Sequence, residues 1–151
     1  MENDNSIETS LKLFVVLSRA YRSISDLANK SIQRFGLNPT EFAVLELLFH
    51  KGETPLQQIG GKILIASGSI TYVVDKLEKK GLLARKQCSK DRRVTYAALT
   101  DEGINFMKEI FPDHEQFVNE IQSSLSHDEK EELIKLLKKL GHGAKNHTLN
   151  Q

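Results

Sequence analysis

The chain has 151 residues, 39% hydrophobic and 27% charged, a composition typical of one folded, soluble domain or of a compact domain with an added assembly element. No segment approaches the roughly 20 apolar residues of a membrane helix, and the acidic, polar start MENDNSIETS is unlike a signal peptide. The single cysteine, Cys88, excludes an internal disulfide and indicates a reducing cytoplasm.

The net charge of +1 conceals an uneven distribution of charge along the chain. Between Asp75 and Arg93, eight Lys or Arg residues stand against three Asp or Glu residues, whereas between Asp101 and Glu132 two Lys residues stand against ten acids. A basic block beside an acidic block favours a protein with one face for an anionic partner. Two solvated helix surfaces would give the same pattern, so charge alone does not decide.

A long first helix is predicted from Ile7 to about Arg34, because two apolar stripes recur there at helical spacing. Two stripes indicate a helix that is covered on more than one side. The next helix is expected to begin with Asn38 as its cap and Pro39 at its first helical position, and Glu41 completes a capping box.

Two further helices and a hairpin are predicted in the middle of the chain. Thr54 should cap a short helix, and Ser67 should cap a longer one that Gly81 ends. Alternation with period two occurs only between Leu82 and Leu99, where LLARKQC and VTYAAL flank SKDRR. This pattern predicts a two-stranded hairpin with a charged tip.

Helical spacing returns after the hairpin. Apolar residues recur every three or four positions from Ile104 to Leu125, with His114 as a polar member that we expect to form a contact within a dimer, and the seam is typical of helix association. A second capping box at Ser126 opens a last helix. We therefore expect dimerisation helices at 1–36 and 101–145, a separate middle domain at 37–100, and a frayed tail at 146–151.

The order of helix, short helix, helix and hairpin predicts a mainly α fold: a winged helix-turn-helix with a two-stranded β-wing, flanked by terminal dimerisation helices. In a helix-turn-helix, the residues near the start of the second helix face the bases in the major groove of DNA. Here those residues are small or carry hydroxyl groups, and an ordinary helix cap would look the same. They are Ser67, Gly68, Ser69, Thr71 and Tyr72.

The hairpin strengthens the prediction that residues 37–100 form a DNA-binding domain. Arg92 and Arg93 at its tip suit the negative potential of a narrow minor groove, and Asp91 can orient the guanidinium of Arg93 or Arg85. A solvated basic turn is the plainer interpretation of the tip alone. The remaining candidate DNA contacts are Thr54, Gln57, Lys76, Arg85 and Lys90.

The segment DRRVTYAALTDEG resembles the wing signature of the multiple-antibiotic-resistance regulator (MarR) family, Asp-x-Arg followed by Leu-Thr-x-x-Gly. Asp91, Arg93, Leu99, Thr100 and Gly103 match its spacing. The resemblance covers nearly the whole chain. It implies a homodimer whose terminal helices interlock and whose two winged domains bind one DNA duplex.

Three other segments, LKLFVVLSRAYRSI, LNPTEFAVLELL and ASGSITYVVDKLEKKGLL, are similar to the branch of this family that responds to 2-methylhydroquinone, quinones and catechols in low-GC Gram-positive bacteria. That similarity implies a repressor of detoxification genes on a palindromic operator, released by an aromatic or quinone-like effector. In the family, aromatic effectors bind between the dimer helices and the winged domain. The candidate effector contacts are Phe14, Leu17, Tyr21, Phe42, Leu45, Glu46 and Phe49, although such stripes are more often plain core.

Other classes of function have less support. No arrangement typical of catalysis occurs, no cofactor motif is present, and the five histidines lack the spacing of metal ligands. A thiol switch at Cys88 is an alternative regulator, because quinones are electrophiles, but the neighbours Lys86 and Lys90 would activate the thiol only mildly. An architectural DNA-binding protein and a winged helix that contacts proteins remain as further alternatives.

Overall fold

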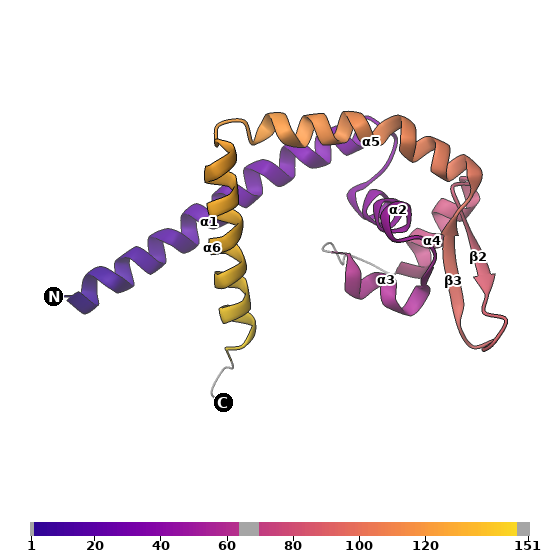
Figure 1. Cartoon of the computed structure of the whole chain (residues 1–151), viewed down its shortest axis with the longest axis horizontal. Coiled ribbons are helices and arrows are strands. Elements are labelled where there is room, and N and C mark those ends of the chain that lie inside the picture. Colours follow the sequence, from indigo (N-terminus) through magenta and orange to yellow (C-terminus); the bar gives the residue numbers. More distant parts are fainter. Residues whose placement is uncertain (1, 64–69, 148–151) are drawn as a thin grey trace. The chain divides into compact units, whose positions relative to one another are not determined.

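A computed structural model of the chain describes residues 2–63 and 70–147, and the structural statements below concern these residues. By their contacts, residues 1–117 and 118–151 form two units, which are described separately. The elements in Figure 1 are α1 (Glu2–Gln33), α2 (Pro39–Lys51), β1 (Thr54–Pro55), α3 (Leu56–Lys62), α4 (Ile70–Lys79), β2 (Leu83–Gln87), β3 (Thr95–Leu99), α5 (Asp101–Ile121) and α6 (His127–Lys145).

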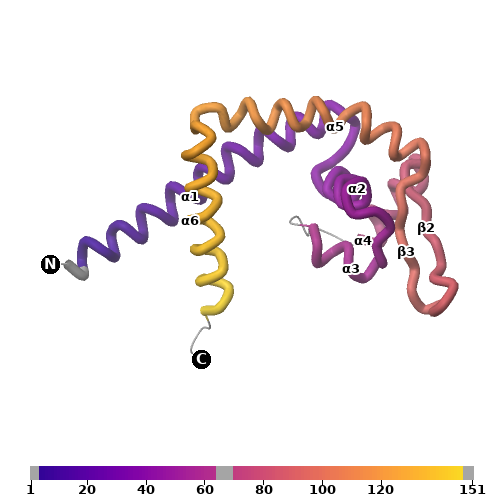
Figure 2. The backbone as a smooth tube through the Cα atoms, viewed as in Figure 1, coloured from indigo at the N-terminus to yellow at the C-terminus, as the bar shows by residue number. Residues whose placement is uncertain are grey.

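The expected winged helix-turn-helix is present. The tube in Figure 2 follows the hairpin from β2 through its tip into β3, beside α2, α3 and α4. The hairpin is antiparallel, with Leu83 opposite Leu99 and Gln87 opposite Thr95. Helix α5 ends at Ile121, so the predicted seam, which extended to Leu125, continues past the helix into a turn.

A third strand extends the sheet of the predicted wing and corrects the predicted helix cap at Thr54. The predicted hairpin of β2 and β3 is present, and β1 pairs with β3, so the sheet has three strands in the order β1-β3-β2. Thr54 lies in this strand, and its hydroxyl donates to the carbonyl of Gly52 (3.0 Å) instead of capping α3. Helix α3 begins at Leu56, directly after Pro55. Pro55 has no amide hydrogen, so it cannot donate a hydrogen bond that would lengthen the pairing of β1 with β3.

The hydrophobic core lies where the helices meet the sheet. Its largest fully buried side chains come from five different elements of the winged domain and α5, so each of these elements depends on the others. They are Leu45, Ile59, Leu77, Leu83 and Met107. The first part of α5 thus contributes to the same core as α4.

Both predicted capping boxes are confirmed. The side chain of Asn38 accepts from the backbone N–H of Glu41 (2.8 Å), and the Glu41 carboxylate accepts from the backbone N–H of Asn38 (3.1 Å). Ser126 and Glu129 make the same reciprocal pair at the start of α6. These bonds satisfy amide groups that would otherwise have no partner at a helix start.

The Leu-Thr-x-x-Gly segment forms a tight junction at the base of the wing. The Thr100 hydroxyl donates to the carbonyl of Gly81 (2.6 Å) and accepts from the backbone N–H of Gly103 (3.0 Å). A Cβ atom at position 103 would lie 1.9 Å from the carbonyl oxygen of Leu82. Only glycine allows the start of α5 to approach the start of the wing this closely.

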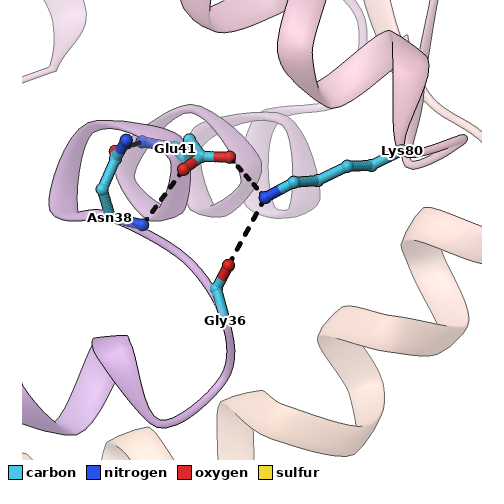
Figure 3. A network of polar contacts seen from close by, with 4 residues as sticks. All are labelled: Gly36, Asn38, Glu41 and Lys80. Carbon is cyan, nitrogen blue, oxygen red and sulfur yellow. Dashed lines mark hydrogen bonds and ion pairs between the residues drawn. The ribbon is translucent and has the colours of Figure 1, made fainter.

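An ion pair connects the start of α2 with the end of α4 (Figure 3). The Lys80 ammonium lies 2.8 Å from the Glu41 carboxylate, and it also donates to the carbonyl of Gly36 (3.4 Å). Only 4% of the Glu41 side chain is exposed. Burial raises the pKa of Glu41, but the hydrogen bonds from Lys80 and Asn38 and the charges of Lys80 and Lys76 outweigh it, so the pKa lies below its ordinary value.

We predict that Lys80→Met lowers the free energy of unfolding by about 1–2 kcal/mol, because the buried Glu41 carboxylate would lose its cation. The cost should be less than that of breaking a wholly buried pair, since 39% of the Lys80 side chain is exposed. Urea unfolding measures the change. Glu53→Gln, which removes the exposed partner of Lys86, is the control and should have little effect.

We also predict that Glu41 contributes to the pH dependence of stability. Its lowered pKa means that the folded chain binds fewer protons than the unfolded chain below the ordinary value of 4.5. The stabilisation is therefore complete above pH 4.5 and is lost as the pH falls through the lowered pKa. Urea unfolding at a series of acidic pH values should show a weaker dependence for Glu41→Gln; an unchanged slope would contradict this role.

Candidate DNA interface and adjoining cavity

Helix α4 occupies the place of a recognition helix. Val73, Val74 and Leu77 are buried in the core, which leaves the opposite side of the helix free. On that side Thr71 is exposed and 63% of Tyr72 is exposed. The Lys76 ammonium lies 5.6 Å from the centre of the Tyr72 ring, a cation–π contact. The candidates Ser67, Gly68 and Ser69 lie outside the described residues.

The wing tip presents an oriented arginine. Asp91 accepts from the backbone N–H of Arg93 (3.1 Å) and from two nitrogens of its guanidinium, Nε (3.1 Å) and Nη2 (3.4 Å). The side-chain and backbone hydrogen bonds from Arg93 hold the pKa of Asp91 below its ordinary value. Because 90% of the Arg93 side chain is exposed, its outer face is open to a partner. Arg92 and Lys90 are exposed at the same tip.

The other candidates differ in their access to DNA. Gln57 is exposed on α3, so its amide is available. Thr54 is buried and its hydroxyl is bonded to Gly52, so its side chain is not available. Arg85 does not contact Asp91; its guanidinium instead bonds Asp75 and Glu78 on α4. The candidate interface therefore consists of the free side of α4, Gln57 and the wing tip.

A cavity of about 1090 Å³ adjoins this interface. It is lined by α1, α2, the end of α3, α4 and His114 of α5. Of the predicted effector contacts, Tyr21, Phe42 and Glu46 line the cavity, together with His50. The volume is large enough for a small aromatic compound.

The remaining predicted effector contacts lie elsewhere. Phe14, 71% exposed, and Leu17 are on the part of α1 outside the cavity, Leu45 is fully buried in the core, and Phe49 packs on Phe111. The reason is helical spacing: Phe42, Glu46 and His50, at intervals of four residues, lie on the side of α2 that lines the cavity, as do Ala43 and Leu47. The predicted set combined both sides of the helix: Phe42 and Glu46 line the cavity, whereas Leu45 lies in the core and Phe49 packs against it.

His114 was not among the predicted cavity residues. Its ring lies 4.6 Å from that of Phe42 and 5.8 Å from that of Phe111, measured between ring centres. Its Nδ1 atom is buried and has no hydrogen-bond partner among the described residues. Burial lowers the pKa of His114, although the charges of Glu46 and Glu115 act in the opposite direction. Its place as the one polar member of the α5 seam was the signal in the sequence.

The helix-turn-helix, the recognition helix and the basic β-wing define a DNA-binding transcription regulator of the winged-helix class. The described helices include none that is both long and apolar enough to cross a membrane. Nor do the described residues include a group of three or more His, Cys, Asp or Glu side chains that could hold a metal ion.

The chain belongs to the MarR family, which its residues 37–95 match. It is 63% identical over 138 residues to the HTH-type transcriptional regulator MhqR of Bacillus subtilis (strain 168), covering 91% of this chain and 95% of that protein. This match agrees with the branch that the sequence segments resemble.

Two solved structures are also similar to the chain. Bordetella bronchiseptica BpsR, whose DNA binding is regulated by 6-hydroxynicotinic acid, is 25% identical with a TM-score of 0.75 (86% of this chain, 98% of that chain). AbsC, a MarR family regulator of Streptomyces coelicolor, is 21% identical with a TM-score of 0.81 (92% and 96%) and supports the fold.

We predict that Arg93→Ala weakens binding to an operator duplex by about 5- to 150-fold for each wing that no longer carries the guanidinium. Arg92→Ala should weaken binding less, mainly through a phosphate contact, and Asp91→Asn should weaken it by releasing Arg93 from its orientation. Fluorescence anisotropy with a labelled duplex at physiological salt measures all three. Equal affinity of Arg93→Ala and the wild type would remove the role assigned to the wing.

Proposed function

We propose that the chain is a homodimeric, cytoplasmic repressor that binds a palindromic operator through α4 and the wing tip. An aromatic or quinone-like compound in the cavity releases it, and detoxification genes are thereby expressed. Family membership, the basic wing and the similarity to MhqR support this proposal. The DNA contacts we assign are the exposed residues of the interface, with Ser67, Gly68 and Ser69 as further contacts that precede α4.

The observation that carries the proposal is that α4 belongs both to the wall of the cavity and to the candidate DNA interface. Tyr72, Val73 and Lys76 of the recognition helix line the cavity, and Tyr72 and Lys76 also belong to the candidate DNA contacts. A compound that fills the cavity therefore touches the helix that reads DNA. It can shift the protein away from its DNA-binding arrangement to the extent that it binds the two arrangements with different affinity.

The lining of the cavity favours a phenol or quinol. Phe42 and Tyr21 provide apolar rings, and the Glu46 carboxylate can accept from a hydroxyl group. His114 also lines the cavity, and its buried Nδ1 would form a second hydrogen bond when a bound compound rearranges the side chains around it. Burial keeps this imidazole in its neutral form more readily than usual. A ring with two hydroxyl groups, such as a hydroquinone, would use both polar sites. The regulation of BpsR by a hydroxylated aromatic acid is consistent with this class of effector.

Exposed apolar residues on the first and last helices support the homodimer. On α1, Ile7, Leu11 and Phe14 are exposed, and on α6 Leu136 and Leu137 are exposed. Apolar surface of this extent is uncommon on a monomer and marks an association surface. The resemblance to dimeric regulators of this family implies that a second copy of the chain covers this surface.

We predict that 2-methylhydroquinone releases Cys88→Ser protein from its operator under reducing conditions. Sequencing of genomic fragments bound with and without the compound would identify the operator, and a mobility-shift titration would then measure release. Footprinting should show protection with two-fold symmetry. Glu46→Gln should bind the operator normally and require more compound, because its amide replaces the charged acceptor.

Other outcomes of this titration would select the alternatives. If Cys88→Ser protein stayed on DNA while the oxidised quinone released the wild type, a thiol switch would replace the cavity mechanism. Binding without sequence preference would favour an architectural protein. No binding to any genomic fragment would contradict DNA regulation altogether.

We predict that Phe14→Glu and Leu137→Glu each weaken the dimer, since each places a charge on an apolar association surface. Sedimentation equilibrium measures the dimer dissociation constant, and Lys135→Glu, an exposed polar position of α6, is the control. Point substitutions test the association surface alone, whereas truncation after Thr100 would also remove Met107 and Ile110 from the core. Dimers of unchanged affinity in both variants would contradict the assignment of the terminal helices.

A further inference from the structure

Arg85 connects the base of the wing with the recognition helix. Its Nη2 donates to Asp75 (2.5 Å) and its Nη1 to Glu78 (2.9 Å). The second carboxylate oxygen of Glu78 accepts from the backbone N–H of Arg85 (3.3 Å). Asp75 and Glu78 are three residues apart on α4 and so lie on one face of the helix. The side chain of Arg85 on β2 is thus bonded to both acids of α4, and its backbone N–H is bonded to Glu78.

The charges around Arg85 do not suit a DNA contact. One guanidinium stands against two carboxylates, so the group as a whole is negative and repels phosphates. The hydrogen bond to Asp75, with further contributions from both acids, raises the pKa of Arg85 above its ordinary value although burial lowers it. Only 26% of the Arg85 side chain is exposed. These features distinguish it from Arg93 at the wing tip, which is open to a partner.

The position of Arg85 in the strand allows this connection to fix the wing relative to α4. Arg85 lies opposite Ala97 at the middle of the β2–β3 ladder, and the chain continues from β2 into the tip that carries Arg93. A bond between β2 and α4 at this level sets the distance and angle between the wing and the recognition helix. Its neighbour Lys86 has only a 3.7 Å pair with Glu53, in which both side chains are exposed.

We propose that Arg85 is a positioning residue: through Asp75 and Glu78 it holds the wing against α4 so that Arg93 and the recognition helix can contact the same duplex. Arg85 itself does not bind DNA. This inference rests on the proposed DNA-binding function and names the residue that aligns its two contact elements. The guanidinium fork suits the task because it can bond two carboxylates at once, which a lysine ammonium does less well.

The test is a set of substitutions measured on the operator duplex recovered from genomic fragments, in full-length protein. The set comprises Arg85→Met, the double change Asp75→Asn with Glu78→Gln, the triple combination, and Arg93→Ala with and without Arg85→Met. Affinity is measured at several salt concentrations, because removal of a phosphate contact lowers the salt dependence by about one unit of slope. Lys86→Met controls for the removal of one positive charge from the same strand.

We expect Arg85→Met to weaken binding by roughly tenfold with the wild-type salt slope. The acid-free double variant should lose a similar factor, and adding Arg85→Met to it should change little. Arg93→Ala should cost less in the Arg85→Met chain than in the wild type, because Arg93 is already misplaced there. Thermal unfolding verifies that each variant is folded. Should Arg85→Met fail to fold, Arg85→Lys replaces it with the same expected pattern at a smaller factor.

Three results would overturn the inference. If Arg85→Met reduced the salt dependence of operator affinity, both in the wild-type background and in the chain without Asp75 and Glu78, Arg85 would contact a phosphate directly. Tighter binding by the acid-free chain would mean that the acids only repel DNA. Equal costs of Arg93→Ala in both backgrounds would mean that Arg85 does not position the wing. If the wild type bound no operator, the proposed function would fail first and this inference with it.

Discussion

The winged domain depends on the close approach of Gly103 to the carbonyl of Leu82. Because no side chain intervenes there, the Thr100 hydroxyl can bond both Gly81 and Gly103, and the end of α4, the wing and the start of α5 meet at one point. Met107 then reaches the core from α5. A larger residue at position 103 would move the helix away and would disturb the wing and the core together.

Helix α4 contacts the core, the cavity and the wing at the same time. Val74 and Leu77 hold it in the core, Tyr72 and Lys76 face both the cavity and the free side, and Asp75 and Glu78 bind the wing. Its position is consequently set by packing, by a wall of the cavity and by ion pairs. A change in any one of these contacts acts on the same short helix, which is the basis of the proposed coupling between the cavity and DNA binding.

Features encoded locally were predictable from the sequence. The two capping boxes and the hairpin follow from residues within a few positions of one another, and the Asp91–Arg93 pair was expected from its spacing. The strand at Thr54–Pro55 was missed because it is two residues long and forms only by pairing with distant β3. The partners of Arg85 and the place of His114 likewise depend on tertiary packing. In α2, apolar spacing alone could not show that Phe42, Glu46 and His50 line the cavity while Leu45 lies in the core.

The buried, unpartnered Nδ1 of His114 has a consequence for the evolution and engineering of this fold. A buried polar atom without a hydrogen bond costs roughly 1–3 kcal/mol, so this atom makes the protein less stable than its packing would otherwise allow. Phenylalanine at this position would extend the ring contacts of Phe42 and Phe111 and would recover part of that cost. Selection for heat resistance alone would therefore tend to remove this histidine, so under the proposed cavity mechanism its presence is a trade-off between stability and ligand response.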